Sequence, residues 1–172
     1  AAEYFRESLE MTRDLHLPML IARLLLNIGS IERNRGNTTL AIDYYRRSLL
    51  TARQDKNPEG TAVALLNLGS MLREMGTYDE SSLLLAEALE LSRSIGQKEY
   101  EGSSLGELAL IRRATATPAN PEQHLVLLAR NVADLRTCVD LLQETHSMET
   151  DKWKTELAAA EQEFAILEAG SL

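Results

Sequence analysis

Three types of polar side chain recur in this sequence at an offset of forty residues. They are Asn27, Ser30 and Arg33 and, forty residues later, Asn67, Ser70 and Arg73. An asparagine amide donates and accepts hydrogen bonds at once, so two amides one repeat apart can bind the backbone of an extended peptide. An arginine guanidinium binds carboxylates, and Arg113 continues that series. The pattern predicts a surface that binds a protein or peptide, including one with acidic groups.

Residues that could support catalysis are scattered along the chain. His16, His124 and His146 fall in different predicted helices, and none has a partner at the spacing of metal ligands. The segment GSSLGE at 102–107 lies in the register of the helical repeat and follows no strand, so it does not predict a phosphate loop. Pairs of acidic residues are typical of charged, solvated helix faces. We therefore predict no enzyme, no metal and no cofactor.

The composition is that of a folded protein without a nucleic-acid or membrane partner. The chain has 172 residues, of which 44% are hydrophobic and 26% charged, and its net charge is −8. Residues 98–172 carry thirteen Asp and Glu against seven Lys and Arg, which disfavours nucleic acid as a partner. No apolar run approaches the roughly 20 residues that span a bilayer. The single cysteine, Cys138, excludes an internal disulfide and fits a reducing compartment, so we predict a cytoplasmic location.

The elements that position the repeated polar residues are pairs of helices. Apolar residues recur at spacings of three and four within 61–74 and again within 84–91, which is typical of amphipathic helices. Gly36 and Gly76 are predicted to end the first helix of a pair, and Thr77 with Glu80 forms a potential capping box for the second. Self-similarity at forty residues indicates an all-α solenoid of stacked helical hairpins.

This sequence resembles the tetratricopeptide repeat family, in a forty-residue variant. The residues that carry the resemblance are Ile28-Gly29, Leu68-Gly69, the turn glycines Gly36 and Gly76, and Ala41 with Tyr45. The family's Trp and Tyr are replaced by Leu25 or Leu65 and by Glu32 or Leu72, and the period is longer than the usual thirty-four. We expect a longer second helix to absorb the extra residues. Gly29 and Gly69 are expected where the two helices of a hairpin cross.

The resemblance implies a right-handed superhelical solenoid whose first helices line a groove, and family members use asparagine there to bind peptides. The repeat region is expected over 1–114, divided into a second helix of a truncated repeat, two repeats and the first helix of a degenerate repeat. Those segments are 1–17, 21–56, 61–97 and 101–114. Asn27 and Asn67 could instead bond to a neighbouring hairpin and stabilise only the stack, and the arginines could be solvated surface.

Residues 115–172 depart from the repeat. Asn120 and Pro121 are predicted to start a long helix with a heptad stripe, and a last helix carries a stripe that begins at Trp153. The simplest interpretation is a capping hairpin that closes the solenoid, and the alternative is a seam for dimerisation or docking. The layout also has a weaker likeness to the C-terminal repeat region of bacterial multidomain ATPase-type transcriptional regulators.

The first residues align with the second helix of a hairpin whose first helix is absent. Tyr4, Phe5 and Leu9 should then lack part of their apolar cover, which predicts self-association or further repeats upstream in a longer protein. Taken together, the sequence predicts a protein- or peptide-binding scaffold, as the sensor or docking part of a larger signalling or regulatory protein. The alternative is a structural array that packs on effector domains of its own chain or mediates dimerisation.

Overall fold

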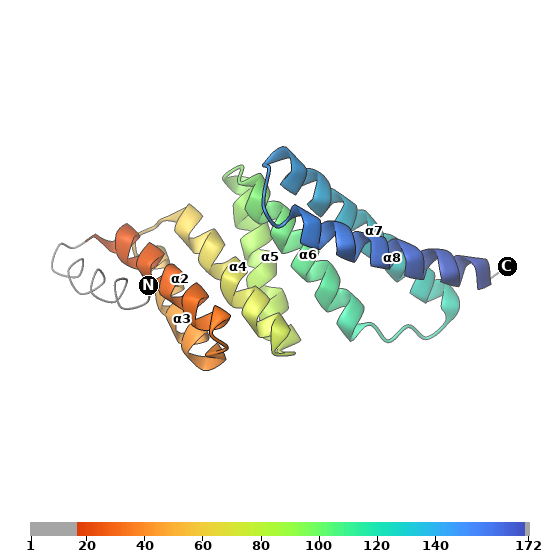
Figure 1. Ribbon diagram of the computed structural model, residues 1–172, viewed down its shortest axis with the longest axis horizontal. Helices are drawn as coiled ribbons and strands as arrows, with labels where there is room; N and C mark the ends of the chain where they lie inside the picture. Colours follow the sequence, from red (N-terminus) through yellow and green to blue (C-terminus); the bar gives the residue numbers. More distant parts are fainter. Residues whose placement is uncertain (1–16, 171–172) are drawn as a thin grey trace. The chain divides into compact units, whose positions relative to one another are not determined.

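The computed structural model describes residues 17–170, and over that range the chain forms seven helices and no strand. The helices are α2 (Pro18–Asn34), α3 (Thr38–Gln54), α4 (Pro58–Glu74), α5 (Tyr78–Ser94), α6 (Lys98–Thr115), α7 (Pro121–Glu144) and α8 (Thr150–Gly170). Helices α2 to α5 belong to one compact unit and α6 to α8 to a second (Figure 1). The all-α class predicted from the sequence is confirmed. Tyr4, Phe5 and Leu9 lie outside the described residues, as does nearly all of the helix predicted over 1–17.

The forty-residue period comes from helices of equal length. Each of α2, α3, α4 and α5 has 17 residues, and three-residue links separate them. Two such helices with two such links make up one repeat. The expectation of a longer second helix is therefore wrong, because both helices of each hairpin have the same length.

Left-handed residues terminate the first helices, as predicted. Gly36 and Gly76 have φ values of 79° and 77°, which glycine adopts without a steric cost. The amide of Asn37 donates to the carbonyl of Glu32 at 2.9 Å, and the amide of Thr77 donates to that of Leu72 at the same distance. These are the bonds of a Schellman motif, which satisfies carbonyl groups that a helix end leaves unpaired.

The capping box predicted at Thr77 and Glu80 is wrong. The Thr77 side chain makes no capping hydrogen bond, and its ψ of 66° differs from the ψ of 100° at Asn57 and 165° at Asn120. Both asparagines have the extended backbone that a capping side chain requires, and each accepts a 2.9 Å bond from the amide three residues later. The predicted cap at Asn120 is thus confirmed, whereas Thr77 is held by the turn that precedes it.

This difference between the caps predicts a difference in stability. We expect Asn57→Ala to lower the free energy of unfolding by about 0.5–2 kcal/mol, because the amide of Gly60 loses its partner. Thr77→Ala should change it by less than about 0.5 kcal/mol, since no capping bond is lost. Urea unfolding followed by circular dichroism measures both variants. An equal loss in the two proteins would contradict the assignment of the caps.

The core of the first unit lies between the hairpins. Its buried side chains include Leu26, Tyr45, Leu49, Leu65, Leu68 and Leu72. A Cβ atom added to Gly29 would lie 2.6 Å from the Tyr45 ring, and one added to Gly69 would lie 2.7 Å from Leu85 Cγ. Both glycines therefore permit the close crossing of two helices, as the sequence predicted.

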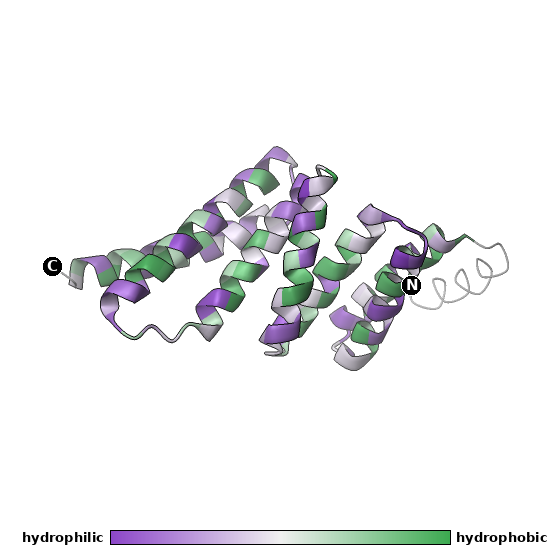
Figure 2. Ribbon diagram, turned by 180° about the vertical axis from the view of Figure 1, so that it is seen from behind, coloured by the Kyte–Doolittle hydropathy of each residue, from purple (hydrophilic) through white to green (hydrophobic). Residues whose placement is uncertain are grey.

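The second unit is a sequence of three helices in which α7 packs on both α6 and α8. The stripe predicted on α7 is buried at Leu128, Leu135, Val139 and Leu142, and Trp153 and Ala160 are buried on α8. Figure 2 shows hydrophilic and hydrophobic residues mixed along the helices. Among the residues described, no helix has the length and apolar character needed to cross a membrane.

Candidate peptide-binding site

Two first helices, α2 and α4, contact each other in the first unit and carry most of the repeated polar residues (Figure 1). We call the surface that they share the α2/α4 face. It is made of Asn27, Ser30 and Arg33 of α2 and Asn67, Ser70, Arg73 and Glu74 of α4. Six of the seven predicted binding residues therefore lie on two helices in direct contact, and Glu74 joins them.

The two asparagines present their amides differently. Asn27 is exposed, whereas Asn67 is half-buried and its Nδ2 donates to the carbonyl of Val63 at 2.8 Å. That bond lies within α4, so it does not join neighbouring hairpins. It uses one of the two N–H donors of the amide and fixes the orientation of the group.

The two serines lie deeper than the asparagines. Ser30 is half-buried, and its Oγ donates to the carbonyl of Leu26 at 3.1 Å and accepts from the Tyr45 hydroxyl at 3.3 Å. Ser70 is only 6% exposed. These hydroxyl groups contribute to the packing of the hairpins.

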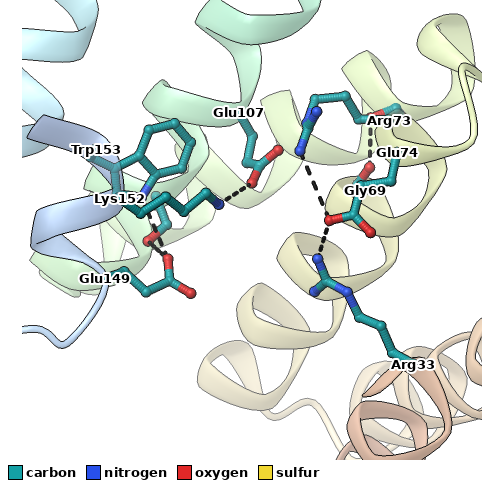
Figure 3. Close-up of polar contacts among 10 residues, drawn as sticks. Arg33, Gly69, Arg73, Glu74, Glu107, Glu149, Lys152 and Trp153 are labelled. Atoms are coloured by element: carbon teal, nitrogen blue, oxygen red, sulfur yellow. Dashed lines mark hydrogen bonds and ion pairs between the residues drawn. The ribbon is translucent and has the colours of Figure 1, made fainter. Parts of the chain in front are cut away.

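The arginines of this face share one carboxylate (Figure 3). Arg33 Nη2 donates to Oε1 of Glu74 across the two hairpins, and Arg73 Nη2 lies 3.9 Å from the same oxygen. The side chains of Arg33, Arg73 and Glu74 are 30%, 19% and 36% exposed. A carboxylate of the protein thus lies where the sequence predicted that carboxylates of a partner would bind.

Arg113, the seventh predicted residue, belongs to the second unit. Its Nη2 lies 2.8 Å from Oε2 of Glu163, and its Nη1 lies 4.0 Å from Glu156. Both carboxylates belong to α8, so Arg113 contacts the helix that follows α7.

Helix α8 also contacts two positions of α6 at which the residues differ from those of the earlier repeats. The positions equivalent to Leu66 and Asn67 are Gly106 and Glu107. A Cβ atom on Gly106 would lie 2.5 Å from Cζ3 of Trp153, and Lys152 Nζ lies 3.2 Å from Oε1 of the buried Glu107 (Figure 3). The indole therefore occupies the space where the earlier copies have a leucine side chain.

Glu149 completes this contact between α6 and α8. Its Oε2 accepts from Ser103 Oγ at 3.4 Å and from the Trp153 indole nitrogen at 3.5 Å. Residues expected to line a groove on α6 are instead covered by α8. The sequence predicted that the terminal helices would cap the solenoid, but not that α8 would cover these residues, although the changes from leucine to Gly106 and from asparagine to Glu107 were visible in it.

A cleft of about 1200 Å³ lies near one end of the second unit. It is lined by Arg113 of α6, Pro121, His124 and Leu125 of α7, and Ile166 and Leu167 of α8. Its walls are mainly apolar, and Glu163 lies between Arg113 and His124, whose Nε2 is 3.9 Å away. The sequence did not predict this cleft.

Metal ligands and the cysteine thiol are further candidate groups for chemistry. Among residues 17–170, no three His, Cys, Asp or Glu side chains are placed to hold a metal ion together. Burial raises the pKa of the Cys138 thiol to about 12, so the group is protonated at neutral pH and is a poor nucleophile.

Part of the chain is similar to a known repeat family. The tetratricopeptide repeat family model matches residues 20–94. Among 41 matching chains of solved structures is the crystal structure of BtubC (BKLC) from P. vanneervenii, with a TM-score of 0.64 and 13% sequence identity. That match covers 97% of this chain and 71% of the other, and at this identity it shows the fold alone. No protein with a curated description matches the chain.

Proposed function

We propose that this chain binds an extended peptide segment of another protein on the α2/α4 face. The support is that residues 20–94 match the model of the tetratricopeptide repeat, a family that generally mediates protein–protein interaction. In this proposal the chain is a scaffold without catalytic activity. It serves as the sensor or docking part of a larger cytoplasmic signalling or regulatory protein.

The main support for the proposal is that Asn27 and Asn67 place two amides on helices that contact each other. Axes of packed helices lie about 8–10 Å apart, and an extended chain rises about 3.3 Å per residue. A peptide that crosses α2 and α4 would therefore meet Asn27 and Asn67 at sites about three residues apart. Each amide can pair with a backbone N–H or C=O group of the peptide, and this mode of binding tolerates many peptide sequences.

The double variant Asn27→Ala and Asn67→Ala tests the proposal. Each amide bond contributes about 1 kcal/mol, so peptide binding should weaken roughly 10- to 100-fold. The thermal midpoint should stay nearly unchanged, because Asn27 is exposed and the Asn67 bond remains within one helix. A peptide library screened against the whole chain supplies the ligands, and fluorescence anisotropy measures their affinity.

Gln54→Ala is the matched control, since Gln54 is an exposed amide on α3 rather than on the α2/α4 face. It should leave binding and stability unchanged. Reduced stability of the double variant with unchanged binding would favour a role of the asparagines in stacking alone.

A structural array is the second candidate function, and the contact of α8 with α6 favours it. Trp153, Lys152 and Glu149 cover residues of α6 that correspond to the binding positions of the other repeats. In the second unit, the surface of α6 that corresponds to these binding positions is thus covered by α8, a helix of the same chain. Packing on effector domains or dimerisation would extend this use, and the peptide library would then give no hits that depend on Asn27 and Asn67.

A further inference from the structure

We propose that Glu74 sets the specificity of the α2/α4 face by acting as a built-in competitor for acidic ligands. Its carboxylate occupies the position between Arg33 and Arg73, and an acidic peptide binds by displacing it. This inference rests on the proposed function, because it assumes that peptides bind this face.

The geometry around Glu74 resembles an occupied carboxylate site. Oε1 accepts a hydrogen bond from Arg33 of the neighbouring hairpin and lies 3.9 Å from Arg73. Guanidinium groups bind carboxylates in a preferred geometry, and a peptide carboxylate offers the same two oxygens as Glu74 does. A ligand with a carboxylate can therefore replace Glu74 without leaving either arginine unpaired.

The Glu74 side chain is also able to move away. It is 36% exposed, and Glu74 is the last residue of α4. A negative charge at the C-terminal end of a helix is disfavoured by the helix dipole, so the helix itself does not hold the carboxylate in place. An ion pair that contacts water is weak, because water and salt screen the attraction.

The repeat does not require an acid at this position. The equivalent residues are Asn34 in the preceding copy and Ala114 in the following one. Glu74 is therefore a feature of this copy, present where two arginines from adjacent repeats converge. With Glu74 in place, the three side chains carry one net positive charge, and without it they would carry two.

The chain contains a matched ion pair on other helices. Arg53 of α3 donates to both carboxylate oxygens of Glu87 on α5 at 2.6 Å, and both side chains are 47% exposed. Glu87→Gln removes one negative charge and the ionic part of a contact between hairpins, as Glu74→Gln does. It leaves the α2/α4 face unaltered, so it controls for net charge and for stability.

Fluorescence anisotropy with two labelled peptides tests the inference. One peptide is twelve residues of alternating Ser and Glu, and the other has Gln in place of every Glu. We expect Glu74→Gln to bind the Glu peptide about 3- to 10-fold more tightly than the unmodified chain does, with no change for the Gln peptide. High salt should abolish the gain, because it screens charges. Glu87→Gln should bind both peptides as the unmodified chain does.

The outcomes separate the two proposals. If the Gln peptide binds in a manner that depends on Asn27 and Asn67, but Glu74→Gln does not change the preference for the Glu peptide, only the role of Glu74 is overturned. An equal gain in Glu87→Gln would also overturn it, because net charge alone would then explain the effect. If neither peptide binds to the unmodified chain, to Glu74→Gln or to Glu87→Gln, both the role of Glu74 and the proposed function are overturned.

Discussion

Replacing Gly106 by leucine, the residue that the preceding repeat has at position 66, is expected to destabilise the second unit by about 3 kcal/mol. A Cβ atom at position 106 would lie 2.5, 2.6 and 2.7 Å from three atoms of the Trp153 ring. The ring is rigid and fully buried, so it cannot yield by rotating one terminal group. The leucine must therefore expel the indole, which separates α8 from α6.

Tryptophan fluorescence during urea unfolding measures this effect, because Trp153 is the single tryptophan of the chain. The emission of the folded variant should shift to longer wavelength as the indole meets water. Gly170→Leu is the control, since a Cβ atom at that position would meet nothing within 4 Å. It should change stability by less than about 0.5 kcal/mol.

A double variant checks that the clash with Trp153 causes the loss. Urea unfolding followed by circular dichroism measures the variants that lack the tryptophan. Trp153→Ala alone should cost about 3–5 kcal/mol, because it leaves a cavity beside α6. Combined with Gly106→Leu it should cost less than the sum of the two single losses, since the leucine can fill part of that cavity. Strictly additive losses would contradict the direct contact between the two residues.

The hairpins were predictable because their signals are local and repeated. Gly29 and Gly69 mark helix crossings, and Gly36 and Gly76 mark turns, each at the same place in two copies. The lengths of the helices were not predicted correctly. A left-handed turn can form without glycine, as Lys56 shows with a φ of 52°, so the end of α3 had no glycine signal, whereas α5 is followed by Gly96 with a φ of 69°.

The candidate site was predictable only in part. The repeat placed Asn27 and Asn67 on contacting helices, since equivalent positions in stacked units share a face. It did not reveal which charges meet, because Arg33 and Glu74 are 41 residues apart and Lys152 and Glu107 are 45 apart. Such pairs depend on the packing of whole helices, which the spacing of residues does not specify. For the same reason, the indole of Trp153 and the missing side chain of Gly106 were not recognised as partners.

Valine at Gly29 should disturb both the stability of the first unit and peptide binding. A Cβ atom there would lie 2.6 and 2.8 Å from two atoms of the Tyr45 ring, which is fully buried between α2 and the other helices of its core. We expect a loss of about 2–4 kcal/mol in the free energy of unfolding, from strain and from exposure of the tyrosine. The Tyr45 hydroxyl would also leave Ser30, so the end of α2 that carries Arg33 loses a support.

Peptide affinity and the free energy of unfolding of Gly29→Val are both measured. Together they show whether the substitution changes the spacing of the two asparagines or only destabilises the helix crossing. Because α2 must shift relative to α3 to admit the valine, Asn27 should move with respect to Asn67, and we expect binding at least 10-fold weaker under conditions where the variant remains folded. Thr39→Val is the control, since it adds a branched apolar side chain at an exposed position of α3 and should cost only a few tenths of a kcal/mol. If Gly29→Val is destabilised but binds peptide as before, the spacing of the two asparagines does not determine affinity, and the α2/α4 face would have to recognise its ligand through one helix alone.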